Sequence, residues 1–165
     1  MIEVALATTA SERQAARDLV LAFNGAGFCQ EGSPASVLWR ALGSYPADRV
    51  EWVIARVDGV IVGASGLVIR PPGFETDLHS LVTAIDPAAY SAELADELVK
   101  GLARYAPWPT NGHRWFTIMA ADSPALPIVR EAYGESLGKC EVELDTPSAG
   151  LVRITGSITG LPWLG

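Results

Sequence analysis

The stretch Leu78–Tyr105, LHSLVTAIDPAAYSAELADELVKGLARY, decides the fold of this 165-residue chain. An apolar strand, predicted over Thr76–Ile85, ends at Asp86-Pro87, and a strongly periodic helix follows almost at once. The apolar residues of that helix recur every three or four positions and share one buried face: Leu94, Leu98, Leu102 and Tyr105. Small α/β proteins that bind phosphorylated cofactors place the phosphate at such a strand-to-helix junction. The junction here has that frame but lacks the glycines expected of it.

Two readings of the junction remain open. In the first, Asp86 is the N-cap and Pro87 the first helical residue, so the helix runs straight to Ala106 and leaves no phosphate loop. In the second, a divergent loop comes first and the helix starts near Ser91.

Toward the N-terminus the chain predicts one strand and two helices. Ile2–Ala7 alternates in polarity and reads as a strand. Ser11 is the predicted N-cap of a helix that glycines end by position 27. Pro34 opens a shorter helix that ends at Gly43.

The segment Arg49–Arg70 is the clearest hairpin. Two apolar runs, VEWVIARV and VIVGASGLVI, flank Asp58-Gly59, a pair that accepts the positive dihedrals of a type I′ turn. Gly63 and Gly66 in the second run predict a bulge or a close backbone approach.

Toward the C-terminus three further strands are predicted, together with a helix that Pro124 opens. The strands span Arg114–Ala120, Lys139–Leu144 and Leu151–Ile158. The resulting order is β-α-α-β-β-β-α-β-α-β-β, which predicts an α/β fold with a mixed central sheet covered on both faces, a three-layer arrangement. No linker or repeat divides residues 1–165, so one domain is expected.

Composition excludes several function classes. The net charge is −7 and basic residues do not cluster, which disfavours nucleic acid as a partner. The acidic balance favours a cationic small molecule instead. No apolar run approaches the length of a membrane span, and the N-terminus does not read as a secretory signal, so we expect a cytoplasmic protein without a membrane partner. Cys29 and Cys140 read as reduced thiols, and His79 and His113 do not suggest a metal.

Three segments resemble the GNAT N-acetyltransferases, and together the resemblance covers nearly the whole chain. The hairpin resembles that family's second and third strands, LHSLVTAIDP its fourth strand, and HRWFTIMAADSPALPIVREAYGESLG its fifth strand and fourth helix. The resemblance implies a GNAT-like domain in which the fourth and fifth strands diverge after residue 80. It implies acetyl-CoA as co-substrate, with pantetheine in the gap beside the fourth-strand backbone of Leu81, Val82 and Thr83.

The resemblance also places the pyrophosphate near Tyr90, Ser91 and Ala95. The family pattern is Arg/Gln-x-x-Gly-x-Gly/Ala, and its positions fall here on Tyr90, Glu93 and Ala95, of which only Ala95 matches. Glycine suits this position because bare N–H groups must approach phosphate oxygens closely. Glu93 instead adds a negative charge at the helix N-terminus, where it favours the helix by itself.

Two catalytic residues follow from the same resemblance. His79 lies on the fourth strand where some members carry the group that accepts the amine proton, and imidazole suits that role at neutral pH. Tyr133 resembles the tyrosine that protonates the departing thiolate. The alternatives are a histidine hydrogen-bonded at the end of a sheet and a core tyrosine near the end of a helix.

Three functions are therefore considered. The first is an N-acyltransferase, with acetyl-CoA as donor and the amine of a small molecule as acceptor. The second is a GNAT-fold protein that no longer uses CoA and has another chemistry or binds a ligand or partner; Glu93 and the missing glycines favour it. The third is a structural subunit, in which the final strands and the hydrophobic tail form a homodimer.

Overall fold

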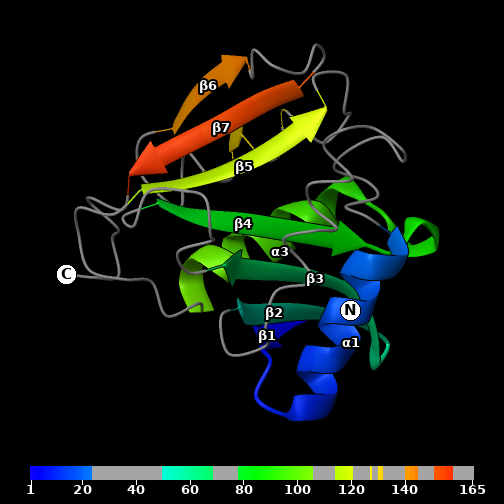
Figure 1. Cartoon of the computed structure of the whole chain (residues 1–165). Coiled ribbons are helices and arrows are strands. Elements are labelled where there is room, and N and C mark those ends of the chain that lie inside the picture. Colours follow the sequence, from blue (N-terminus) through cyan, green and yellow to red (C-terminus); the bar gives the residue numbers. More distant parts are fainter. Residues whose placement is uncertain are drawn as a thin grey trace.

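Within the described residues, one seven-stranded sheet runs through the molecule in the order β1-β2-β3-β4-β5-β7-β6 (Figure 1). The computed structural model describes residues 1–23, 50–68, 78–105, 114–120, 127, 130–131, 140–144 and 151–157. The strands are β1 Ile2–Leu6, β2 Val50–Val57, β3 Val60–Val68, β4 Leu78–Ile85, β5 Arg114–Ala120, β6 Cys140–Leu144 and β7 Leu151–Ser157. The helices are α1 Ala10–Phe23 and α3 Ala92–Tyr105, with a short 3-10 turn η2 at Pro87–Ala89. All neighbouring strands in that order are antiparallel except β4 and β5, which are parallel.

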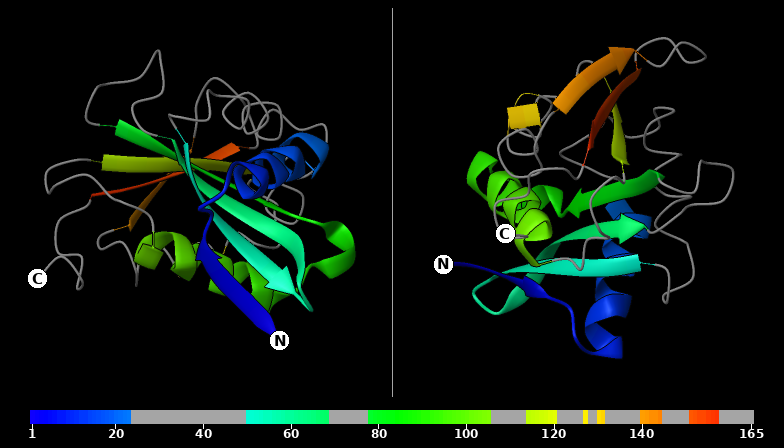
Figure 2. Two further views of the ribbon diagram at one scale, coloured as in Figure 1. Left: turned by 90° about the horizontal axis from the view of Figure 1, so that it is seen from below. Right: turned by 90° about the vertical axis from the view of Figure 1, so that its left-hand side faces the viewer.

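The two helices cover opposite faces of the sheet (Figure 2). On one face α1 packs over a cluster of buried residues from β2, β3 and β4, which includes Trp52, Ile54 and Val82. On the other face α3 packs over a second cluster, which includes Leu67, Leu81 and Leu98. The predicted three-layer α/β fold with a mixed sheet is thereby confirmed. Alternation along each strand sends successive side chains to the two clusters.

The β2–β3 hairpin has the turn that its sequence predicts. Asp58 and Gly59 both have positive φ, at 51° and 82°, as a type I′ turn requires. The register shifts beyond Ala55, which pairs with Gly63, and Val62 becomes the extra residue of a bulge. The Val62 carbonyl accepts a hydrogen bond from the N–H of Asp86 (2.8 Å), so the bulge also fixes the end of β4.

The start of α1 corrects one prediction: the N-cap is Thr9, not Ser11. The Thr9 hydroxyl accepts from the N–H of Glu12, and the Glu12 carboxylate accepts from the N–H of Thr9, both at 3.1 Å. This reciprocal pair is a capping box. Glu12 also forms an ion pair with Arg56 on β2 (2.6 Å). The Arg56 guanidinium, with the N–H donors of Thr8 and Thr9, lowers the pKa of Glu12 to about 2.

Several predicted elements lie partly or wholly outside the described residues. They are the helix predicted from Pro34 to Gly43, most of the helix predicted from Pro124, and Cys29. Residues 127, 130 and 131 of the second of these helices are helical. The last two strands are described over Cys140–Leu144 and Leu151–Ser157, and the predicted end residues Lys139 and Ile158 lie outside the described residues.

Candidate functional site

The parallel strands β4 and β5 pair over a short distance and then part. Their register consists of Leu78↔Arg114, His79↔Trp115 and Ser80↔Phe116, although β4 continues to Ile85 and β5 to Ala120. Figure 1 shows the two arrows diverging toward their C-terminal ends. The divergence predicted after residue 80 is thus present in the described residues.

Alternation determines which backbone groups of β4 face the gap. The N–H of Asp86 bonds to β3, so Ala84 and Val82 also direct their backbone groups toward β3. Leu81, Thr83 and Ile85 therefore direct theirs toward β5. Thr83 and Ile85 lie beyond the last β4–β5 pair, and both residues are fully buried. Because buried backbone groups are nearly always paired, this edge is suited to a ligand that supplies strand-like partners.

Two buried hydroxyls flank the same part of β4, one on each side. Ser65 of β3 donates to the Val82 carbonyl (3.3 Å), and its Oγ lies 2.8 Å from the Thr83 hydroxyl. Thr117 of β5 donates to the Leu81 carbonyl (3.2 Å). The sequence reasoning missed Ser65 and Thr117. Their signal was a polar residue inside an otherwise apolar strand, but their partners depend on register.

The β4–α3 junction is a turn and not a continuous helix. Asp86 caps only η2, where its carboxylate accepts from the N–H of Ala88 (2.9 Å). Tyr90 is then extended (φ −60°, ψ 130°), and the Ser91 hydroxyl caps α3 by accepting from the N–H of Leu94 (3.0 Å). Of the two readings of this junction, the structure has the second: the helix does not run straight from Pro87, because Ser91 supplies a second N-cap that restarts it.

The first N–H groups of α3 lie before its first helical hydrogen bond. Ser91 Oγ satisfies Leu94, and the first helical bond runs from the Ala95 N–H to the Ser91 carbonyl (3.1 Å). The N–H groups of Ala92 and Glu93 precede that bond, in the position where helices bind anions. The side chain of Glu93 is exposed in this first turn.

Three of the six predicted cofactor residues, Leu81, Tyr90 and Ala95, belong to or pack against the core cluster under α3, whereas Val82 lies in the cluster on the opposite face of the sheet. Tyr90 is partly buried against the core cluster that contains Leu81 and Ala95. Its partial burial raises the pKa of the phenol, so the hydroxyl stays protonated. Val82 differs from its neighbours Leu81 and Thr83, because its carbonyl is directed toward β3.

The two predicted catalytic residues are placed only in part. The backbone of His79 lies in β4 opposite Trp115, two residues before Leu81, and its side chain is outside what the structure describes. Tyr133 lies outside the described residues altogether.

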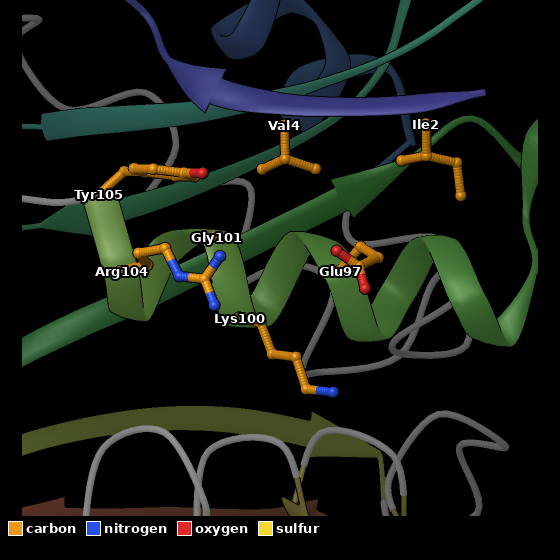
Figure 3. A pocket seen from close by; sticks show the side chains of 7 residues that line it. All are labelled: Ile2, Val4, Glu97, Lys100, Gly101, Arg104 and Tyr105. Carbon is orange, nitrogen blue, oxygen red and sulfur yellow. The ribbon is translucent and has the colours of Figure 1, made fainter. Parts of the chain in front are cut away.

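A separate hollow of about 410 Å³ lies between β1 and α3 (Figure 3). Ile2 and Val4 point into it from β1, and α3 contributes the other lining residues: Glu97, Lys100, Gly101, Arg104 and Tyr105. β1 is an edge strand three strands from β4, so this hollow is distinct from the gap between β4 and β5.

No described helix has the length and apolar character to cross a membrane. Within the described residues, potential metal ligands do not gather in groups of three or more.

A mixed sheet whose parallel central strands part beside a capped helix N-terminus is the architecture of the GNAT fold, and solved structures confirm that fold. One is the acetyltransferase of the GNAT family from Streptococcus pneumoniae (TM-score 0.55, 12% identity, 96% of this chain and 100% of that chain). Another is a GNAT superfamily phosphinothricin acetyltransferase from Sinorhizobium meliloti, in complex with acetyl-CoA (TM-score 0.57, 13% identity, 94% of this chain and 88% of that chain). A third is the GNAT domain of S. lividans PAT (TM-score 0.58, 10% identity, 94% of this chain and 89% of that chain). No protein-family model and no curated protein sequence matches the chain.

Proposed function

We propose that this protein is an N-acyltransferase that uses acetyl-CoA to acylate the amine of a small molecule. The observation that carries the proposal is the early end of β4–β5 pairing at Ser80↔Phe116. It leaves the β5-facing side of β4 at Thr83 and Ile85 without a strand partner among the described residues, whereas the other side pairs with β3. Pantetheine is a slender chain with two amide groups, so it can pair with such an edge as another strand would.

The start of α3 supports the same cofactor. The N–H groups of Ala92 and Glu93 would receive the pyrophosphate, with the protonated hydroxyls of Tyr90 and Ser91 beside them. The phosphinothricin acetyltransferase with the same fold was solved in complex with acetyl-CoA.

The reaction would proceed by direct attack. The neutral amine attacks the thioester carbonyl, and the resulting oxyanion accepts a hydrogen bond from a β4 N–H in the Leu81–Thr83 region. The Thr83 N–H suits this role best, because it faces the gap just beyond the last paired residues. Collapse of the intermediate breaks the carbon–sulfur bond. His79 would accept the proton from the amine, and Tyr133 would protonate the CoA thiolate.

The GNAT resemblance implies that the acceptor contacts residues 11–45, of which 24–45 lie outside the described residues. The net charge of −7 favours a cationic amine as the substrate that approaches this protein.

Ligand-dependent thermal stability tests the proposal. Acetyl-CoA at 100 times its dissociation constant should stabilise the protein by about 2.7 kcal/mol. No shift at millimolar acetyl-CoA would reject the acyltransferase and leave the second candidate, a GNAT-fold protein that does not use CoA. That candidate draws on Glu93, whose carboxylate stands where the pyrophosphate would bind.

The charge of Glu93 can be tested separately. Glu93→Gln should tighten acetyl-CoA binding, because it removes a negative charge beside the helix N-terminus. Glu97→Gln is the matched control, since Glu97 is also exposed on α3 but lies one turn further along. Equal affinities of the two variants would show that Glu93 is not near the pyrophosphate.

A further inference from the structure

The hydroxyl of Thr117 occupies the point where β4 and β5 separate. Their last pair is Ser80↔Phe116, and Thr117 is the next residue of β5. Its side chain is 1% exposed, and its hydroxyl donates to the Leu81 carbonyl at 3.2 Å. The hydrogen bond therefore lies at the closed end of the gap between the two strands.

This bond takes the place of a backbone bond. If the parallel ladder continued in register, the Leu81 carbonyl would accept from the N–H of Ile118. The pairing stops before that step, and the same carbonyl accepts from the Thr117 side chain instead. Because a hydroxyl oxygen is carried on a side chain, it satisfies Leu81 without holding the two backbones at ladder distance.

From this geometry we infer that Thr117 is a positioning residue that ends the β4–β5 ladder and so sets where the acyl-donor slot begins. The residue does not touch the reacting atoms. Beyond the Thr117–Leu81 hydrogen bond, Thr83 is the first residue of β4 whose N–H faces the gap. The position of this hydrogen bond therefore determines how far into the gap a thioester carbonyl must reach to accept from the Thr83 N–H. The inference about the slot rests on the proposed function, whereas the inference about the ladder does not.

The test uses two substitutions at one position. Thr117→Val keeps the shape of the side chain and replaces the hydroxyl by a methyl group, so the buried Leu81 carbonyl loses its donor. The nearest replacement is the Ile118 N–H, which would extend the ladder by one step and shorten the slot. Thr117→Ser keeps the hydroxyl and should behave as the wild type.

Ser65 provides a matched control on the opposite side of β4. Its hydroxyl is also fully buried and donates to a β4 carbonyl at nearly the same distance, but to Val82 on the β3 side. Ser65→Ala should lower stability and leave hydrogen exchange of the Ile118 amide unchanged, because Ser65 contacts β4 from the β3 side. If the Thr117 hydrogen bond had a structural role alone, Thr117→Val would give the same result as Ser65→Ala.

Two readouts decide the inference, both taken on the folded protein. Thr117→Val should slow hydrogen exchange of the Ile118 amide and raise the dissociation constant for acetyl-CoA by about tenfold, the effect of one net hydrogen bond. Thr117→Ser should restore both. Unchanged Ile118 exchange in Thr117→Val overturns the inference, and so does slowed exchange with an unchanged dissociation constant.

The two proposals fail in different ways. If the wild type does not bind acetyl-CoA, the proposed function fails, and Ile118 exchange alone decides whether Thr117 ends the ladder.

Discussion

The close contact between α3 and β1 predicts that Gly101→Ala destabilises the wild type but stabilises a Val4→Ala variant. A Cβ added at Gly101 would lie 2.3 Å from Cγ1 of Val4 and 3.2 Å from Cγ1 of Val53. The first distance is more than an ångström short of ordinary contact, which begins at 3.4 Å. Gly101→Ala must therefore push β1 away from the helix or distort Val4.

The expected magnitude combines two opposing effects. Overpacking of this kind costs about 1–3 kcal/mol, and replacing a helical glycine by alanine returns about 1 kcal/mol. Gly101→Ala should thus destabilise the wild type by about 1 kcal/mol. In a Val4→Ala background the clashing methyl is gone and the remaining Cβ of residue 4, at 3.5 Å, is an ordinary contact, so only Cγ1 of Val53, at 3.2 Å, must move, by a few tenths of an ångström. There the same substitution should stabilise by up to about 1 kcal/mol.

Urea unfolding of the wild type, the two single variants and the double variant measures this cycle. The predicted coupling between positions 4 and 101 is about 2 kcal/mol, well above the error expected for independent sites. If Gly101→Ala stabilises the protein equally in both backgrounds, α3 does not approach β1 as described.

Three further predictions concern the remaining local structure. The stabilisation from Glu12 should be complete above pH 4.5 and disappear as the pH falls toward 2, because its pKa is lowered from 4.5 to about 2 in the folded state. Urea unfolding of the wild type and Glu12→Gln from pH 7 to 2.5, with Glu97→Gln as the control, measures this stabilisation. A difference in unfolding free energy between the wild type and Glu12→Gln that persists unchanged at pH 2.5 would contradict the prediction. Thr9→Ala should lower stability by about 1 kcal/mol, whereas Ser11→Ala should have little effect; the reverse order would restore Ser11 as the N-cap. Gly59→Ala should cost about 1 kcal/mol through its positive φ alone, since nothing lies within 4 Å of the added carbon; a neutral result by thermal unfolding would argue against the turn.

The sequence predicted the elements whose signals are local. Asp58-Gly59 determines its own turn type, and the spacing of apolar residues in α3 determines the buried face. The N-cap of α1 was missed although its signal was local too, because Thr9 and Glu12 form a capping box three residues apart. The break after Asp86-Pro87 depended on Ser91, a second capping residue that competes with the first.

The parts of the site that depend on register could not be derived from the residues alone. Thr117 and Ser65 are ordinary hydroxyl residues in apolar strands until the sheet places Leu81 and Val82 beside them. The divergence of β4 and β5 came from the family resemblance and not from any local pattern, because where two strands stop pairing is set by contacts 36 residues apart in the chain.

Amide hydrogen exchange along β4 tests the account most directly. The N–H groups of Val82 and Ala84 are directed toward β3, whereas those of Thr83 and Ile85 face the gap. In the free protein the amides of Thr83 and Ile85 should exchange faster than those of Val82 and Ala84, and acetyl-CoA should slow them selectively. Equal protection of all four amides without ligand, unchanged by acetyl-CoA, would mean that no slot exists beside β4.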